Sequence, residues 1–259
     1  GLLWGMKDNE VANEHPRYKS FGDANGDLNH VAQFDPGPAT EEVAEALMDW
    51  PNFKDIDKLA YKNNESFGFG PSYRGNTRDP QVIILADQMG HTDFFSTRAL
   101  TGEAGQMLQT FLNKTGLEGE DSYLILRPLP VDTLGVSTGK KIGLAVAEDA
   151  SGKSAIKTIQ SIIEALGGGE KTLVTMGPVA TEMGERFVGK MQQMNVKNIF
   201  DMQQPDRSYN HVQNWVQVAE KMGGEVPSEG ELKALWMIPR KDLPYSSRWW
   251  MGTTGENAD

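Results

Sequence analysis

The sequence predicts an α/β protein in which helices cover both faces of a mostly parallel sheet, giving three layers. The first observation is the apolar run at 82–85, which has the composition of a strand buried on both faces. The second is that such runs alternate with segments of helical periodicity, the pattern of βαβ units. The third is size and composition: 259 residues, with 38% hydrophobic and 24% charged side chains, suit one globular domain with extensions.

The individual elements follow from local periodicity and from their boundary residues. The expected strands lie at 82–85, 122–126, 171–176 and 198–202, and an edge strand closed by Pro239 is expected at 234–239. The expected helices lie at 40–50, 102–112, 154–166, 180–188 and 209–222. In the third of these helices, Ile156, Ile159 and Ile163 share one face, and the glycines at 167–169 end it.

These elements divide the chain into three parts. Residues 78–225 form the α/β domain, residues 1–77 an N-terminal extension wrapped on it, and residues 226–259 a C-terminal extension. In the N-terminal part, segment 23–29 spaces oxygens like the beginning of a calcium loop. Leu28 stands where such a loop needs glycine, so the segment is interpreted as an ordinary Asx-rich turn.

Charge and cysteine content exclude several classes. A formal net charge of −11 argues against a protein that coats nucleic acid, although an enzyme acting on DNA needs only a local basic groove. The absence of cysteine excludes disulfides and thiolate nucleophiles and fits a reducing cytoplasm, which is the expected location. The four histidines show no metal-ligand spacing, so no metal is expected. No apolar run approaches the ~18 residues of a membrane span.

Two blocks carry the most specific pattern in the chain. Residues 86–90 read ADQMG at the end of the first strand, and residues 97–106 read TRALTGEAGQ before the next helix. Together they resemble motif 1 of the uracil-DNA glycosylase superfamily, in the bacterial and archaeal branch with GEAPG and GRPFVGRAGQ at the same spacing. Segments 172–180 and 199–206 are similar to that family's LGxxA and HPS segments, so the resemblance covers roughly residues 80–225.

The resemblance implies the family's three-layer fold and hydrolysis of an N-glycosidic bond in DNA. That reaction needs a carboxylate or oriented water at the sugar, a donor for the leaving base, and a pocket for a flipped nucleotide. Asp87 falls on the family's water-activating Glu, Gln88 is placed to orient water or bind the base, and Gln204 falls on its catalytic His. The alternative for Asp87 is a turn or helix-capping residue. Typical members hold an iron–sulfur cluster on four cysteines, which this chain lacks, so no cofactor is expected.

Base recognition is expected from the loop after the first strand and from the end of the second. The candidate base-binding residues are Met89, His91, Phe94, Phe95, Leu100, Leu126 and Arg127. For the two phenylalanines, stacking on a base and anchoring of the loop stay open, and for His91, which shares the loop with Asp93, a plain surface role stays open. The family's uracil-reading Asn falls on Leu126, which lacks a paired donor and acceptor. The predicted substrate is therefore a damaged or modified pyrimidine rather than uracil.

The candidate DNA-binding residues are Arg207, Ser208, Tyr209, Lys140 and Lys141. The first three resemble the family's DNA-inserting loop, where side chains contact phosphate or wedge into the base stack. Ser208 as the cap of the following helix is the alternative. The aromatic and basic residues at 240–250 are of a kind that stacks on bases, or else they fill a groove on the core.

The sequence thus predicts a monomeric DNA glycosylase that has DNA as its partner and flips a damaged or modified pyrimidine, such as a hypermodified viral cytosine in anti-phage defence. Two alternatives lie within the family: a non-catalytic nucleic-acid-binding relative and a conventional uracil-DNA glycosylase. The loss of the family's His and Asn and the acidic charge favour the first of these. A third alternative is an unrelated sugar- or nucleotide-binding α/β protein, which a pocket lined by Asp87, Leu126 and Gln204 would exclude.

Overall fold

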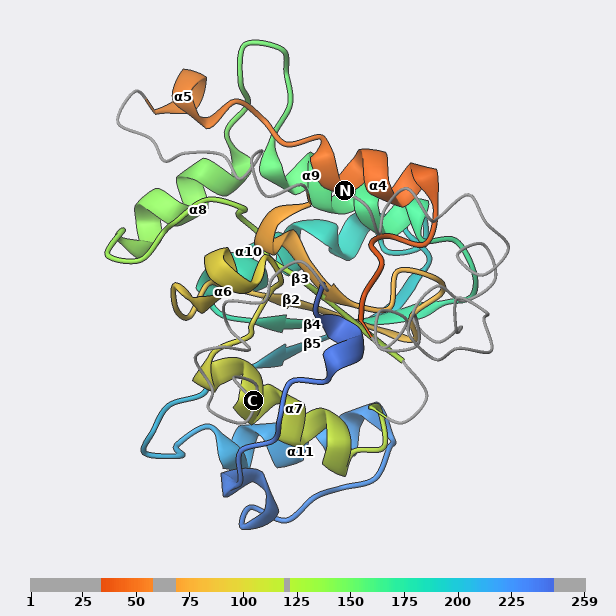
Figure 1. The fold of residues 1–259 in the computed structure, drawn as a ribbon. Coiled ribbons are helices and arrows are strands. Elements are labelled where there is room, and N and C mark those ends of the chain that lie inside the picture. The colour runs from red at the N-terminus through yellow and green to blue at the C-terminus, as the bar shows by residue number, and fades with distance from the viewer. Residues whose placement is uncertain (1–33, 58–68, 119–121, 245–259) are drawn as a thin grey trace, which may run out of the picture.

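The computed structural model describes residues 34–57, 69–118 and 122–244. A five-stranded sheet in the order β1-β3-β2-β4-β5 forms its centre (Figure 1). The strands are β1 (Tyr73–Gly75), β2 (Val82–Ala86), β3 (Tyr123–Leu126), β4 (Lys171–Met176) and β5 (Val196–Met202). β1 runs antiparallel to β3, and the other neighbours are parallel. The strands predicted in the α/β domain are confirmed, whereas β1 was not predicted and lies within the segment 1–77.

Helices lie on both faces of the sheet, so the predicted α/β class with three layers is confirmed (Figure 1). They are α4 (Glu41–Met48), α5 (Phe53–Ile56), α6 (Thr92–Ser96), α7 (Glu103–Lys114), α8 (Thr138–Val146), α9 (Ala155–Ala165), α10 (Pro178–Phe187) and α11 (Val212–Met222). Thr40 and Ser154 cap α4 and α9 with their hydroxyl groups. α8 was missed because Gly139 and Gly143 dilute its apolar pattern.

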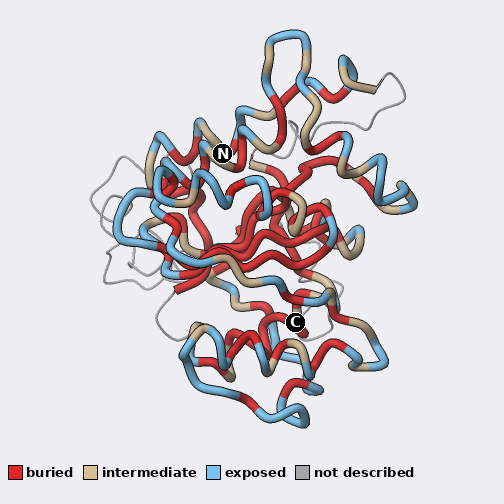
Figure 2. The backbone as a smooth tube through the Cα atoms, turned by 180° about the vertical axis from the view of Figure 1, so that it is seen from behind, coloured by how far each residue is buried: buried red, intermediate tan, exposed pale blue. Residues whose placement is uncertain are grey.

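Two apolar cores pack against the opposite faces of the sheet, and β1, β2, β3 and β4 are buried along their whole length, whereas the edge strand β5 is partly exposed (Figure 2). In β2, Ile83 and Leu85 face α4, α9 and α10, whereas Val82, Ile84 and Ala86 face α7 and α11. Successive side chains of a strand point to opposite faces of the sheet. Because helices bury both faces of β2, the run of residues in the sequence is continuously apolar.

The sheet has a topological switch point between β2 and β4. The chain passes from β2 outward to β3, then returns to β4 on the other side of β2 and continues to β5. The loops that leave the carboxyl ends of β2 and β4 therefore diverge, and the space between them is where open α/β sheets bind ligands.

The segments before and after the α/β domain are joined to it by buried charges. Asp35 accepts hydrogen bonds from Arg98 at 3.0 Å and from the Tyr73 hydroxyl at 2.6 Å. Arg74, which is fully buried in β1, pairs with the equally buried Asp242 at 2.7 Å. The described parts of both extensions are thus part of the folded unit.

The predicted edge strand at 234–239 is wrong, because this segment lies along α7 instead of beside a strand. The N–H of Trp236 donates to the carbonyl of Gln106 at 3.2 Å, and the Thr110 hydroxyl donates to the carbonyl of Ala234 at 2.6 Å. The calcium-like segment 23–29 and the aromatic residues beyond Pro244 lie outside the described residues.

Candidate functional site

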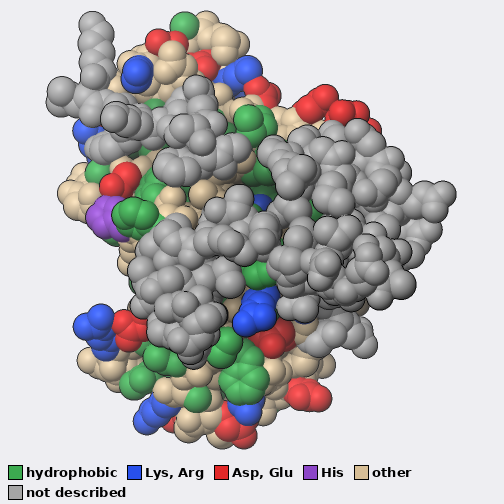
Figure 3. Space-filling model, viewed as in Figure 1, with side chains coloured by type: hydrophobic (Ala, Val, Ile, Leu, Met, Phe, Trp, Pro, Cys, Tyr) green, Lys and Arg blue, Asp and Glu red, His purple; other side chains and the backbone are tan. Residues whose placement is uncertain are grey.

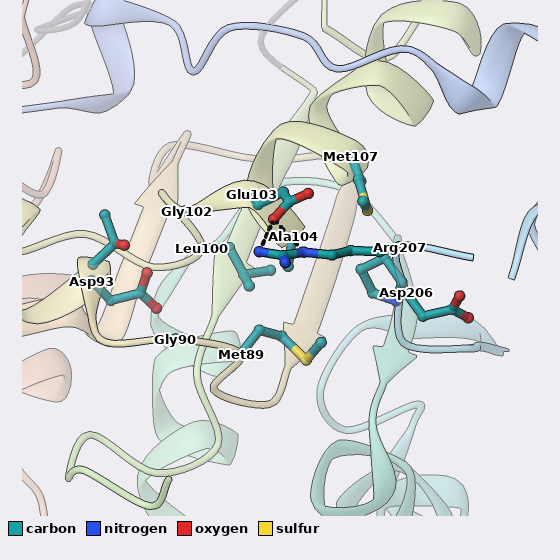
Figure 4. Close-up of a pocket in the computed structure, with 13 residues that line it drawn as sticks. Met89, Gly90, Asp93, Leu100, Gly102, Glu103, Ala104, Met107, Asp206 and Arg207 are labelled. Carbon is teal, nitrogen blue, oxygen red and sulfur yellow. Dashed lines mark hydrogen bonds and ion pairs between the residues drawn. The ribbon is translucent and has the colours of Figure 1, made fainter. Parts of the chain in front are cut away.

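A pocket with a cavity volume of about 240 Å³ lies at the carboxyl edge of the sheet (Figure 4). Its lining comes from the loop after β2, the beginning of α7 and the loop after β5. The lining residues are Met89, Gly90, Thr92, Asp93, Leu100, Gly102, Glu103, Ala104, Gly105, Met107, Pro205, Asp206 and Arg207. The volume is below the ~300–1,000 Å³ of sites for drug-sized ligands, so it suits a group the size of one base or sugar ring.

The pocket has apolar walls and a charged mouth. Met89, Leu100 and Met107 supply the walls, and Arg207 lies between α7 and the loop after β5 (Figure 4). The Arg207 guanidinium pairs with the Glu103 carboxylate at 2.9 Å, although the Arg207 side chain is 86% exposed. A pair so exposed contributes about 0–1 kcal/mol, so either partner is available to a ligand at little cost.

The backbone of the wall is shaped by an unusual turn before α7. Leu100 has a φ of 51°, and a side chain at Gly105 would run into its carbonyl group. Arg74 holds this turn, because its Nε and Nη2 atoms donate to the carbonyls of Ala99 and Leu100 at 2.8 and 3.0 Å. Gly105 is therefore required by the close approach of two backbone segments.

Asp93 is the buried acid of the pocket. It lies in the first turn of α6 and is 2% exposed. Its Oδ1 atom accepts the N–H of Thr101 at 3.0 Å, whereas Oδ2 has no hydrogen-bond partner among the described residues. The carboxylate is directed into the pocket (Figure 4). Burial raises the pKa of Asp93, while the positive charge of Arg127 and the Thr101 N–H lower it.

Arg127 is a second buried group with unused hydrogen-bonding capacity. It is 1% exposed, and its Nη2 atom donates to the carbonyl of Val131 at 3.0 Å. Its guanidinium carbon lies 5.0 Å from the centre of the Phe94 ring. The Nε and Nη1 atoms have no partner in the described part of the chain. Burial lowers the pKa of Arg127, and nearby Asp93 raises it.

Asp87 caps α10 across the switch point. Its Oδ2 and Oδ1 atoms accept the N–H groups of Val179 and Ala180 at 3.1 and 2.8 Å. Gly177 has a φ of 113°, and a Cβ atom there would lie 2.5 Å from the Asp87 carboxyl carbon. Burial raises the pKa of Asp87, and the two N–H groups oppose that shift. The capping interpretation of Asp87 thus has a direct structural basis.

Gln88 belongs to a polar group on the other side of the loop after β2. Its Oε1 atom accepts the N–H of Thr133 at 2.7 Å, and its amide nitrogen donates to the carbonyl of Gly90 at 3.1 Å. The exposed ring of His91 lies 2.9 Å from the carboxylate of Asp132, which also contacts Gln88. Gln88 is thus buried and held by the loop at 132–133, whereas His91 stays exposed to solvent beside Asp132.

Gln204 and His211 shape the loop after β5. The Gln204 amide lies 3.0 Å from the Met89 sulfur, so Gln204 supports a wall residue and does not itself line the pocket. The buried Nδ1 atom of His211 accepts the N–H of Asp206 at 3.1 Å, and its ring packs on Trp215 with 4.4 Å between ring centres. His211 thereby positions a residue of the pocket mouth.

The pH dependence of stability is expected to report on His211. Burial lowers its pKa, so between about pH 7.5 and 5.5 the unfolded state binds a proton that the folded state excludes. The free energy of unfolding should therefore fall as pH falls, by up to about 1.4 kcal/mol per pH unit. Urea titrations across this range measure the slope. His211→Gln should flatten it and the exposed-site control His91→Gln should keep it; equal slopes in both variants would contradict the assignment.

The remaining predicted residues are placed as follows. Arg207, Met89 and Leu100 line the pocket, whereas Asp87, Leu126 and Gln204 do not. The pocket therefore does not exclude the third alternative, an unrelated sugar- or nucleotide-binding α/β protein. Leu126 belongs to the core beneath α9 and α10, because its position in β3 turns it to that face. Phe94 contacts Arg127, and the Phe95 side chain is 57% exposed.

Some of the predicted DNA-binding residues also lie at the pocket and others lie elsewhere in the structure. Lys140 pairs with Asp57 at 2.7 Å, and Lys141 lies close enough to lower the pKa of Asp87. Ser208 is not a helix cap, because α11 begins at Val212; its N–H donates instead to Asp206 at 2.7 Å. Tyr209 has a φ of 59°, which orients it within the same turn. On the face shown in Figure 3, basic side chains are interspersed with acidic ones among the described residues.

Sequence reasoning did not assign roles to Asp93 or His211. In the sequence, Asp93 looks like any aspartate in a loop. What distinguishes it is a buried oxygen without a hydrogen-bond partner among the described residues, and that feature arises only when the loop folds. The signal for His211 is its place one residue before the apolar face of α11, at Val212 and Trp215.

The chain matches no protein-family model and no curated protein. Among the helices of the described residues, none combines the length and apolar character needed to cross a bilayer.

Proposed function

We propose that the protein is a DNA glycosylase that hydrolyses the N-glycosidic bond of a damaged or modified pyrimidine after flipping it from the duplex. The observation that carries the proposal is the shared pocket of the two motif blocks and the loop after β5. The loop after β5 is far from the two blocks in the chain, and the resemblance to the uracil-DNA glycosylase superfamily is what singled out all three segments. The proposal includes the finer fold assignment to that superfamily.

The chemistry of the site supports this reaction. A flipped base needs a small, largely apolar slot with a few polar groups, and the pocket offers Asp93 and Thr92 within walls of methionine and leucine. Asp87 does not line the pocket and stays the proposed water-positioning residue on the basis of the resemblance. Each of its oxygens accepts one N–H in the structure, which leaves a lone pair on each for water.

A non-catalytic nucleic-acid-binding relative is the second candidate. The engagement of both Asp87 oxygens by α10 favours it, as does the use of the Gln204 amide to support Met89. In such a protein the pocket would hold an extruded base, but no water would be activated to attack the sugar.

Abasic-site formation distinguishes the two functions. DNA containing uracil, a thymine mismatch, 5-hydroxymethylcytosine or its glucosylated form is incubated with the protein, and strand cleavage by alkali is measured. The glycosylase is expected to act on one modified pyrimidine and to lose about 10²–10⁴-fold of its rate in Asp87→Asn. Asp55→Asn, an exposed carboxylate in α5, is the matched control and should keep the wild-type rate.

The other outcomes are equally informative. DNA binding without cleavage on every substrate would establish the non-catalytic relative. Absence of both binding and cleavage would overturn the assignment to nucleic acid.

A further inference from the structure

Buried polar atoms without a partner among the described residues lie on Asp93, which lines the pocket, and on Arg127, which does not line it. Asp93 Oδ2, Arg127 Nε and Arg127 Nη1 are all buried and have no partner among the described residues. An unsatisfied buried polar group costs about 1–3 kcal/mol, so native structures retain few of them without a functional reason. These three belong to two side chains of opposite charge at the same edge of the sheet.

The two side chains influence each other without forming a direct pair. Arg127 is the strongest charged neighbour of Asp93, and Asp93 is the strongest charged neighbour of Arg127. No ion pair between them occurs among the described residues, although both are otherwise held firmly, Asp93 by Thr101 and Arg127 by Val131. Because the carboxylate and the guanidinium do not pair with each other, their remaining lone pair and N–H groups are left for a bound ligand.

We propose that Asp93 reads the base in the pocket by accepting an N–H from the edge of a pyrimidine, with Arg127 as its positioning residue. The inference rests on the proposed function and names the recognition group of that site. A pyrimidine edge carries an N–H donor beside an acceptor: N3–H beside a carbonyl in uracil, or the exocyclic amine beside N3 in cytosine. Asp93 Oδ2, directed into the pocket, is the matching acceptor (Figure 4).

Thr101 makes the polarity of this contact testable. Its N–H donates to Oδ1 at 3.0 Å, so an asparagine at 93 keeps its oxygen on Thr101 and turns its NH₂ group toward the pocket. Asp93→Asn therefore replaces an acceptor by a donor at one point in the pocket. Protonation of the wild-type carboxyl group has the same effect, since an O–H then stands at Oδ2.

Arg127 sets the pH at which that protonation occurs. Burial raises the pKa of Asp93, and the cation of Arg127 counteracts the shift, as Arg74 does more weakly. The other charged groups around the pocket are Glu103, Asp206 and Arg207 at its mouth. Removing the Arg127 charge should move the protonation of Asp93 to higher pH, whereas Arg127→Lys should keep it closer to that of the wild type.

Calorimetric binding of free nucleosides tests the inference separately from catalysis. The probes are deoxyuridine, deoxycytidine, 3-methyldeoxyuridine and N4,N4-dimethyldeoxycytidine, the last two lacking the N–H in question. The wild type should bind one parent nucleoside about 10- to 100-fold more tightly than its methylated form. Asp93→Asn should exchange the preference between uracil and cytosine, and Asp55→Asn should leave it unchanged.

Acid conditions and Arg127 variants complete the experiment. The wild-type preference should approach that of Asp93→Asn as pH falls, and Arg127→Gln should shift this change upward in pH. An Asp93→Asn variant that folds, as judged by its melting temperature, and keeps the wild-type preference would overturn the inference. If it also released bases from DNA like the wild type, the glycosylase function would stand without it.

Discussion

Replacing Asp242 by alanine is expected to lower the free energy of unfolding by about 3–5 kcal/mol, the cost of leaving a buried charge without its partner. Asp242 and Arg74 are both fully buried, and they pair at 2.7 Å. The Tyr123 hydroxyl also donates to Asp242, and Gln109 accepts a bond from Arg74 at 2.7 Å. Truncation therefore leaves the buried Arg74 guanidinium without its counter-charge and removes the acceptor of the Tyr123 hydroxyl.

Chemical denaturation measures this effect, and two variants sharpen it. The double variant Arg74→Met/Asp242→Leu should be far less destabilised, because an apolar pair of similar volume removes both charges together. Glu182→Ala breaks an exposed pair with Arg186 in α10 and should cost only about 0.5 kcal/mol. Equal losses in Asp242→Ala and Glu182→Ala would show that the buried pair does not hold the C-terminal segment to β1.

The second large effect is expected at Gly177, where alanine should cost about 2–4 kcal/mol. A φ of 113° is strained for any residue with a side chain, and the new methyl group would lie 2.5 Å from the carboxyl carbon of Asp87. The Asp87 cap on α10 would have to move, which releases the N–H groups of Val179 and Ala180.

A double-mutant cycle separates strain from collision. Asp87→Ala alone should cost about 1–3 kcal/mol through the two lost hydrogen bonds. In that background Gly177→Ala meets no carboxylate, so the combined loss should be clearly smaller than the sum of the two single losses. Additive losses would contradict the close approach of Gly177 and Asp87.

The same contact links stability to the proposed chemistry. Asp87 is raised in pKa by burial, so its protonated form stabilises the fold below the ordinary value of 3.8, and this contribution is lost as pH rises through the folded-state pKa. An ionised Asp87 at neutral pH is thus maintained at a cost to stability. Buried groups kept in an unfavourable state are typical of functional positions.

Both extensions contribute to the site through buried charges. Asp35 holds Arg98 and Tyr73, and Arg74 holds the turn before α7 by its bonds to Ala99 and Leu100. The turn that forms the pocket wall is therefore stabilised by residues from the beginning and the end of the described chain.

The sequence alone determined the parallel strands and most of the helices, because periodicity and caps are local. The run at 82–85 was continuous because both faces of β2 are covered, and the helix predicted at 154–166 is α9, which Ser154 caps. β1 escaped prediction because its Tyr-Arg-Gly sequence has no apolar run. The segment 234–239 has the composition of a strand, but it forms hydrogen bonds with α7. Its partner is set by the surface that the tertiary structure places beside it, which local sequence does not contain.

The tertiary structure decided which polar residues have unused atoms. Asp87 and Asp93 are both loop aspartates in the sequence, yet α10 occupies the oxygens of Asp87, whereas Thr101 leaves one oxygen of Asp93 free. That difference arises from partners 92 and 93 residues away in one case and 8 in the other. The partners of a buried polar group are set by the tertiary structure and can come from distant parts of the chain. The order of the strands therefore predicts the edge of the sheet at which the site lies, whereas only the structure shows which side chain has an atom left for a ligand.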